Sequence, residues 1–200
     1  MDYTDLTRVK QAMDSAESYK DDVLSDYITR ASRLLDRLCT SQPNVSDYFM
    51  QEDVANEVLT NGAIDYDGRL FVWPHKPIIT AVTALAVRYS LKSGWNAVDT
   101  TLISIEQDAV MFEGALPYSE RVYAQISYTG GLGKTLTDLP QDIVDAATLM
   151  AVRLYKEARS GLGDSIGVAE LGTLVYTKAY PTRVMDLLNA GNYIRTARWF

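Results

Sequence analysis

The first forty residues have the apolar spacing of amphipathic helices. Leu6, Val9 and Met13 recur at intervals of three and four residues, which places them on one face of a helix. Thr4 or Asp5, just before them, can cap the free backbone amides of the first turn. We therefore expect a short helix to begin near residue 5.

A longer helix is predicted to follow the acidic pair Asp21-Asp22, whose charge suits the positive end of a helix dipole. Its apolar positions form one wide stripe: Val23, Leu24, Tyr27, Ile28, Ala31, Leu34, Leu35 and Leu38. Pro43 and its polar neighbours are typical of a chain break. We therefore expect this helix to end near residue 40.

Between about residues 54 and 128 the apolar spacing changes to the two-residue period of strands. The predicted strands cover residues 54–60, 69–73, 79–89, 102–107, 109–112 and 121–128. Turn sequences such as Asn61-Gly62 and Glu113-Gly114 separate them. This middle region is therefore predicted to be a small antiparallel β unit.

Helical spacing returns after the glycine-rich segment 130–133. Apolar residues lie on nearly every face of the predicted helix between residues 143 and 158. A helix that is apolar all round is buried on several sides, in its own core, in a contact with another subunit, or in both. We assign Met150, Leu154 and Tyr155 to a subunit interface.

Both ends of the chain are thus predicted to be helical, and a last short helix should stop near Gly191. The simplest assembly is an α+β fold, in which a helical bundle formed by both chain ends carries an inserted small antiparallel β unit. The bundle would comprise residues 1–42 and 138–191, and the insertion about residues 48–130. The chain of 200 residues would then be a single domain, with residues 192–200 as a C-terminal tail.

The composition is that of a folded chain with an acidic balance. Apolar residues make up 47% and charged residues 22% of the sequence, as in ordinary globular domains. The 26 acidic and 19 basic residues give a net charge of −7, which disfavours a protein whose main task is to grip nucleic acid. The longest nearly unbroken apolar run, residues 78–87, is too short to span a bilayer, so we expect no membrane segment.

The segment Gly130-Gly131-Leu132-Gly133-Lys134-Thr135 looks at first like a phosphate-binding loop. That motif requires a glycine where Tyr128 stands, and a helix that starts at the lysine, whereas residues 137–140 delay the helix. A connection between a strand and a helix is the better interpretation.

Acidic residues in the β region raise the question of a metal site. Asp65 and Asp67 hint at a calcium loop, but Arg69 occupies the next ligand position, so a hairpin turn fits better. A magnesium site of a carboxylate-metal hydrolase would require these two residues to converge with Glu106 and Asp108, and nothing in their spacing demands that.

The single His75 and the single Cys39 complete the search for catalytic groups. His75 lies between two prolines and is interpreted as a loop residue, and Cys39 has the helical spacing of a small core residue. We expect no enzyme activity, no catalytic or metal-binding residues and no cofactor.

The end of the chain is rich in residue types that anchor protein interfaces. Tyr193, Arg195, Arg198, Trp199 and Phe200 lie close together there. Arg, Trp and Tyr are the commonest hot-spot residues, and large aromatic side chains at a terminus need something to cover them. Either another molecule or this chain's own core could do so, and we favour another molecule.

Four segments together resemble the head–tail connector (adaptor) proteins of tailed bacteriophages and gene-transfer particles. They are the helical stretch ASRLLDRLC at 31–39, the strand and proline-flanked turn at 70–78, the strand and glycine pair at 122–131 that lead to the helix start LPQDI, and the short helix at 184–188. The strand, glycine pair and helix start are the most specific of these. The family often has adjacent prolines in the turn, whereas this chain spaces them.

The resemblance implies a structural virion protein at the head–tail junction, made in the host cytoplasm. Such adaptors form a ring, usually a dodecamer, beneath the portal protein, and the opposite face of the ring receives the tail or a stopper protein. DNA passes through the lumen during ejection without sequence-specific binding. The C-terminal segments dock on the portal, which would make Tyr193, Arg195, Arg198, Trp199 and Phe200 the portal-docking residues. The alternative within virions is a tail-completion or terminator protein.

Overall fold

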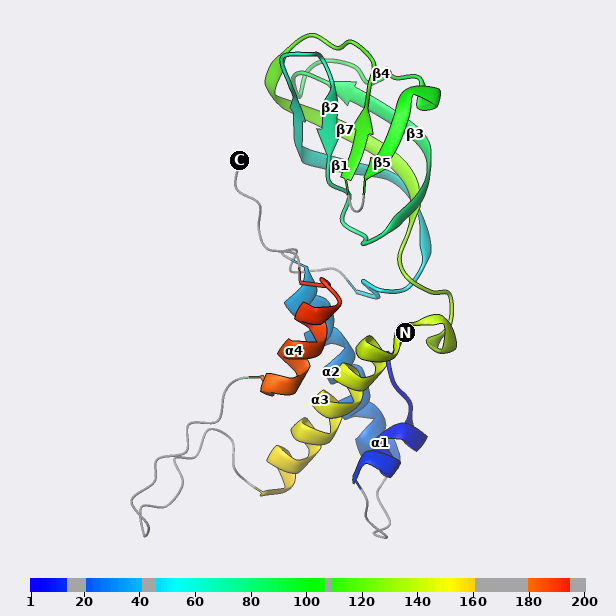
Figure 1. The fold of residues 1–200 in the computed structure, drawn as a ribbon, viewed down its shortest axis with the longest axis vertical. Coiled ribbons are helices and arrows are strands. Elements are labelled where there is room, and N and C mark those ends of the chain that lie inside the picture. Colours follow the sequence, from blue (N-terminus) through cyan, green and yellow to red (C-terminus); the bar gives the residue numbers. More distant parts are fainter. Residues whose placement is uncertain (14–20, 41–45, 107–108, 161–179, 195–200) are drawn as a thin grey trace, which may run out of the picture. The chain divides into compact units, whose positions relative to one another are not determined.

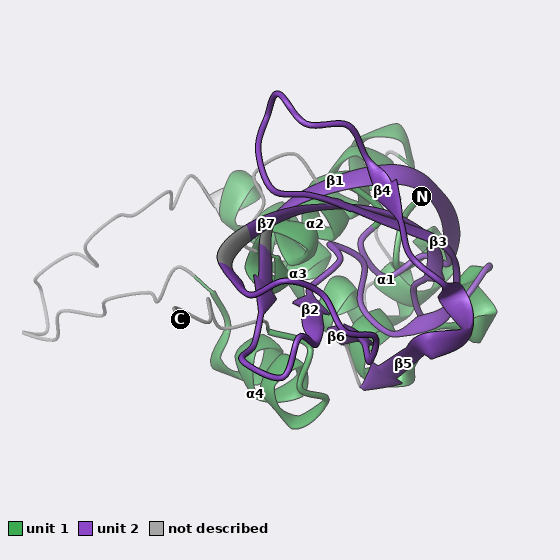
Figure 2. Cartoon of the chain, turned by 90° about the horizontal axis from the view of Figure 1, so that it is seen from above, with its two compact units in different colours: residues 1–47, 135–200 green, residues 48–134 purple. Residues whose placement is uncertain are grey.

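The computed structural model describes residues 1–13, 21–40, 46–106, 109–160 and 180–194 (Figure 1). The chain divides into two compact units (Figure 2). One comprises residues 1–47 and 135–200 and is called the helical unit below; the other comprises residues 48–134 and is called the β unit.

Four α-helices make up most of the described part of the helical unit: α1 (Leu6–Met13), α2 (Asp21–Cys39), α3 (Gln141–Ser160) and α4 (Thr182–Ala190). Helix α3 packs against each of the other three (Figure 1). The predicted cap of α1 is present, because Asp5 accepts a hydrogen bond from the amide of Arg8 at 2.9 Å. Leu35 on α2, Ile143 on α3 and Leu188 on α4 are fully buried.

Seven strands form the β unit: β1 (Glu52–Ile64), β2 (Leu70–Val72), β3 (Ile79–Arg88), β4 (Asn96–Ala97), β5 (Ile103–Glu106), β6 (Ala109–Phe112) and β7 (Ser119–Gly130). Their order in the sheet is β4-β3-β7-β1-β2-β6-β5, and all neighbours are antiparallel. The 3₁₀-helix η1 (Thr100–Leu102) leads into β5. A second 3₁₀-helix, η2 (Leu136–Asp138), precedes α3 in the helical unit.

The sheet is curled because the strands on both sides of β7 are irregular. Register shifts in β1 and β3 add residues opposite β7, and such bulges increase local twist and bend. Two of these shifts meet at Ser127: its hydroxyl oxygen accepts the Asn56 amide at 3.0 Å, and its carbonyl oxygen accepts the Thr83 hydroxyl at 3.1 Å. Asn56 has a positive φ of 54°.

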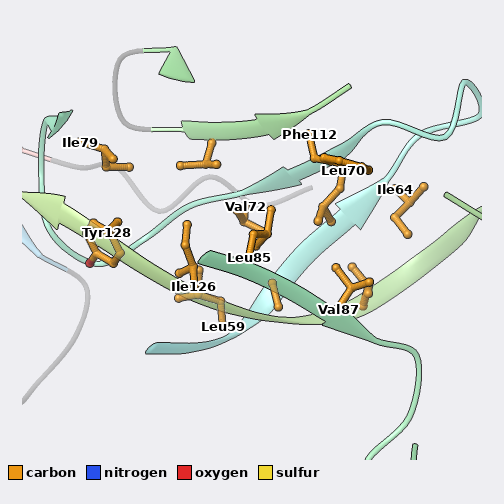
Figure 3. Packing of buried hydrophobic residues seen from close by; sticks show 13 residues of the cluster. Leu59, Ile64, Leu70, Val72, Ile79, Leu85, Val87, Phe112, Ile126 and Tyr128 are labelled. Carbon is orange, nitrogen blue, oxygen red and sulfur yellow. The ribbon is translucent and has the colours of Figure 1, made fainter. Parts of the chain in front are cut away.

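The curled sheet encloses a core of its own (Figure 3). Thirteen buried residues form it: Leu59, Ile64, Leu70, Val72, Ile79, Leu85, Val87, Val110, Phe112, Val122, Ala124, Ile126 and Tyr128. The last four alternate along β7, which confirms the two-residue period in that strand.

The predicted fold class is wrong. Residues 48–134 are not a small insertion in a helical bundle: they form a curled, half-barrel-like antiparallel sheet of seven strands, one of the two compact units. The apolar period located the strands, but period alone gives neither strand length nor pairing. Strands β1 and β7 run for 13 and 12 residues, and their curling closes a separate core that the sequence pattern did not indicate.

Candidate functional site

Two of the segments that carry the sequence resemblance meet within the β unit. The proline-flanked turn after β2 lies against the glycine pair at the end of β7: the Gly131 amide donates to the carbonyl oxygens of Pro77 at 2.7 Å and Ile78 at 3.2 Å. The Lys76 amide donates to the Tyr128 hydroxyl at 3.1 Å. These contacts define a junction that joins residues 73–78 to 128–133.

The two glycines of this junction are required by its geometry. Gly131 has a φ of +114°, and a Cβ there would lie well under 3.0 Å from the Met50 carbonyl oxygen. A Cβ on Gly130 would lie 2.9 Å from the Cβ of Lys76. Any side chain at either position would therefore push apart segments that are now in contact.

The junction also holds together the two segments by which the chain enters and leaves the β unit. The Gln51 amide donates to the Gly133 carbonyl oxygen, and the Leu132 amide donates to that of Phe49, both at 2.8 Å. The amides of Gly131 and Leu132 are thus engaged by carbonyl oxygens of the chain. A phosphate-binding loop needs such amides to be directed at a ligand.

Charged side chains border the junction. Lys76 is only 6% exposed, and its ammonium group donates to the Met50 carbonyl oxygen at 3.2 Å and pairs with the Glu52 carboxylate at 3.0 Å. His75, placed in the turn as predicted, pairs through Nδ1 with Glu57. Burial acts to raise the pKa of Glu57, but the bonds and charge attraction from His75, with a bond from Tyr128, outweigh it and lower that pKa.

The acidic turn between β1 and β2 is occupied by an arginine. The Arg69 side chain pairs with Asp65 at 3.1 Å and with Asp67 at 2.7 Å, and its amide donates to Asp65 at 2.8 Å. Glu106 lies at the end of β5, and Asp108 lies outside the described residues. No three potential metal ligands come together within the described ranges.

A second polar cluster lies in the helical unit, within the resembling segment 31–39. Asp36 is completely buried and accepts hydrogen bonds from the Tyr3 hydroxyl, from Arg33 at 2.8 Å and from the Asp47 amide at 3.1 Å. Arg33 also pairs with Asp47 at 2.9 Å, and the Met1 amino group contacts the same carboxylate. This N-terminal clamp ties the first residues and residue 47 to α2.

The residues assigned to a subunit interface have different exposures. Met150 is only 1% exposed, whereas Leu154 and Tyr155 are half-buried. The Tyr155 ring meets the Tyr27 ring edge-on at 5.9 Å between centroids, and the Arg159 guanidinium lies 5.8 Å from the Tyr155 ring. Their role in subunit contact stays a prediction.

Of the five residues assigned to portal docking, only Tyr193 is described. Its amide donates to the Leu188 carbonyl oxygen at 2.9 Å, and its ring lies over Gly191, so the chain turns back onto the end of α4. Burial, with a smaller effect of Asp142, raises the pKa of Tyr193. Arg195, Arg198, Trp199 and Phe200 lie outside the described residues.

The sequence analysis missed one cluster of the β unit. The Arg88 guanidinium lies 4.3 Å from the Trp95 ring centroid and 5.3 Å from that of Tyr123. Arg88 stands opposite Tyr123 where β3 pairs with β7, and Trp95 returns on the hairpin to β4. The sequence analysis predicted no strand between residues 89 and 102, so it missed β4, and the pairing of β3 with β7 had no sequence signal.

Comparisons with known proteins give a likeness of fold. No protein-family model and no curated protein matches the chain. A chain from the neck of an empty GTA (gene transfer agent) particle, computed with C6 symmetry, is 17% identical; the match covers 97% of this chain and 90% of that one, with a TM-score of 0.52. A chain from a native GTA virion is 19% identical; the match covers 94% of this chain and 84% of that one, with a TM-score of 0.48. A chain from the neck of a native GTA particle, computed with C12 symmetry, is 18% identical; the match covers 98% of this chain and 90% of that one, with a TM-score of 0.46.

The first of these matches shows that both units of this chain belong to one known fold, because it spans nearly the whole length of both proteins. At 17% identity it shows the fold and nothing further. None of the described helices is long and apolar enough to cross a membrane.

Proposed function

We propose that this protein is a structural component of a phage-like particle: a head–tail connector that forms a ring beneath the portal, joins capsid to tail and lines part of the DNA channel. The observation that carries the proposal is the fold shared with a GTA neck chain over 97% of this chain. The sequence motifs that resemble adaptor proteins support it independently, since two of them build the junction in the β unit.

The charge of the chain fits this role. A connector must let DNA slide through its lumen, and a surface rich in Lys and Arg would hold the phosphates instead. With a net charge of −7, a ring of such chains offers DNA few attractive contacts. The proposed partners are the portal protein on one face and a tail or stopper protein on the other, and the proposed ring has twelve copies.

The proposal includes no catalytic step. The amides of Gly131 and Leu132 donate to carbonyl oxygens, and the paired aspartates of the β1–β2 turn are bound by Arg69. These groups are occupied in building the fold.

Particles assembled without this chain test the proposal. We expect DNA-filled heads and separate tails to accumulate, and the wild-type chain to restore joined particles. Trp199→Ala with Phe200→Ala should fail to restore them if the C-terminal residues dock on the portal, whereas Tyr66→Ala, which removes an aromatic ring that is 89% exposed in the β unit, should succeed. Normal joined particles in the absence of the chain would refute the proposal.

A further inference from the structure

The hairpin between β3 and β4 holds an arginine without an acceptor. The Arg88 guanidinium lies over the rings of Trp95 and Tyr123, and within the described part of the chain its side chain has no hydrogen bond or ion pair. Its Nε atom is buried and unpaired. A guanidinium that lies over aromatic rings can still bind a carboxylate through the N–H groups of its two terminal nitrogens.

Apolar side chains are exposed on the same hairpin. Leu91 is 69% exposed and Tyr89 is 38% exposed. The turn between them and β4 is held by reciprocal hydrogen bonds between Ser90 and Ser93, each amide donating to the other's hydroxyl oxygen at 3.2 Å. A turn fixed in this way loses little conformational freedom when it binds a partner.

The charge of the hairpin is opposite to that of the chain. Residues 88–97 contain Arg88 and Lys92 and no acidic residue, whereas the whole chain has a net charge of −7. A second copy of this protein therefore has a net charge opposite to that of the hairpin. Two hairpins facing each other would bring like charges together, so the complementary surface must lie elsewhere on the second copy.

We propose that the β3–β4 hairpin docks onto an acidic surface of a second copy of this chain, where Arg88 receives a carboxylate and Leu91 and Tyr89 are buried. Such a contact joins two different surfaces, and a contact of this kind repeated around an axis closes into a ring. The inference rests on the proposed ring and names the element that forms its subunit contact.

Other features of the β unit favour this assignment over its competitors. DNA would engage the two basic residues but gain nothing from an exposed Leu91, since phosphate offers no apolar surface. The other exposed aromatic group is the stacked pair Tyr66 and Tyr118, with centroids 4.6 Å apart. Beside it, Arg69 already has acidic partners, so that turn has no unpaired cation to offer.

Photo-cross-linking of the full chain tests the contact. A benzophenone side chain introduced at Leu91 should give covalent dimers at low salt, and the linked peptides should lie outside residues 88–97 and contain Asp or Glu. The same group at Tyr66, which is more exposed than Leu91, is the matched control and should give few dimers. Arg88→Gln should lower the yield from position 91 about tenfold, as expected for loss of a charge-assisted pair.

Lys92→Gln changes an exposed residue outside the cluster of Arg88, Trp95 and Tyr123, and it should lower the cross-linking yield about twofold by weakening the charge attraction to the acidic surface. Four results would each overturn the inference. They are equal cross-linking from positions 91 and 66, cross-links only between two hairpins, cross-linking to added DNA in place of a second copy, and the absence of dimers. Joined particles that contain the chain but show none of these dimers would overturn the hairpin contact and leave the proposed connector function intact.

Discussion

The two units of this protein are stabilised by different kinds of interaction. The helical unit buries polar groups: Asp36 and Ser32 are fully inaccessible, and the hydroxyls of Thr4 and Thr148 meet at 2.7 Å. The β unit has an enclosed core that is apolar apart from the Tyr128 hydroxyl, its buried charged side chain, Lys76, lies at the junction, and its curvature comes from bulges and glycines. The helical unit should therefore be sensitive to the loss of single hydrogen-bonding groups, and the β unit to changes of volume and backbone geometry.

Optical signals can follow the two units separately. Trp73 and Trp95 lie in the β unit, so in a Trp199→Phe background tryptophan fluorescence reports on that unit alone. Far-ultraviolet circular dichroism is dominated by the helices. The comparison predicts that substitutions will move one unfolding transition more than the other in urea.

The largest effect is expected from Asp36→Ala. Removal of this buried carboxylate takes away the acceptor that the Tyr3 hydroxyl, the Asp47 amide and one nitrogen of Arg33 share, which should cost about 4 kcal/mol in the free energy of unfolding followed by circular dichroism. Asp26→Ala on the same helix is the control: its pair with Arg30 is exposed, and its loss should cost about 0.5 kcal/mol. Equal effects of the two substitutions would contradict the importance of the N-terminal clamp.

Leu85→Ala should act mainly on the β unit. Leu85 is 2% exposed in the enclosed core, and truncation of such a side chain costs about 3 kcal/mol. The fluorescence transition should shift to lower urea, with a smaller shift in circular dichroism. Leu91→Ala removes an exposed leucine of the same unit and should change stability by less than about 0.5 kcal/mol. Coincident shifts of both signals by Leu85→Ala would mean that the units unfold as one.

Gly131→Ala should destabilise the β unit by about 2 kcal/mol, because its φ of +114° and its contact with Met50 leave no room for a methyl group. Gly94→Ala is the matched substitution, since a Cβ there meets no atom within 4 Å. A stability unchanged by both would show that the junction is looser than its hydrogen bonds indicate.

The smallest expected effect is the response of the β unit to acid. His75 lowers the pKa of Glu57 in the folded state, so this pair stabilises the unit above the ordinary Glu pKa, and the stabilisation is lost as pH falls through the folded pKa. Glu57→Gln should therefore flatten the fall in the fluorescence-detected stability below about pH 4.5. If Glu57→Gln leaves the fall in stability unchanged, a group other than Glu57 is responsible for the acid response.

Local structure was largely predictable from the sequence, whereas assembly was not. The spacing of Leu6, Val9 and Met13 located α1, and each of the six predicted strands overlaps an observed strand, whereas β4 was not predicted. Helix periodicity and alternation are properties of neighbouring residues and survive in any fold. The order of the sheet depends on pairs such as Arg88 and Tyr123, far apart in sequence, and these have no local signal.

In the candidate sites, too, the residue types could be recognised in the sequence, whereas their contacts could not. The glycine pair at 130–131 stood out in the sequence, but its reason, the close approach of Met50 and Lys76, is visible only in the fold. Asp36 looked like any polar position on an amphipathic helix, and its burial depends on Tyr3 and Asp47 from other segments. The C-terminal assignments rest on residue type and on the resemblance to adaptors.

Electron cryo-microscopy of the neck of purified particles that contain this chain tests the central proposal most directly. The connector role predicts a ring of twelve copies in contact with the portal, in which the seven-stranded β unit can be fitted to every copy. A chain located at another part of the tail, or a neck ring whose density does not fit this fold, would contradict it.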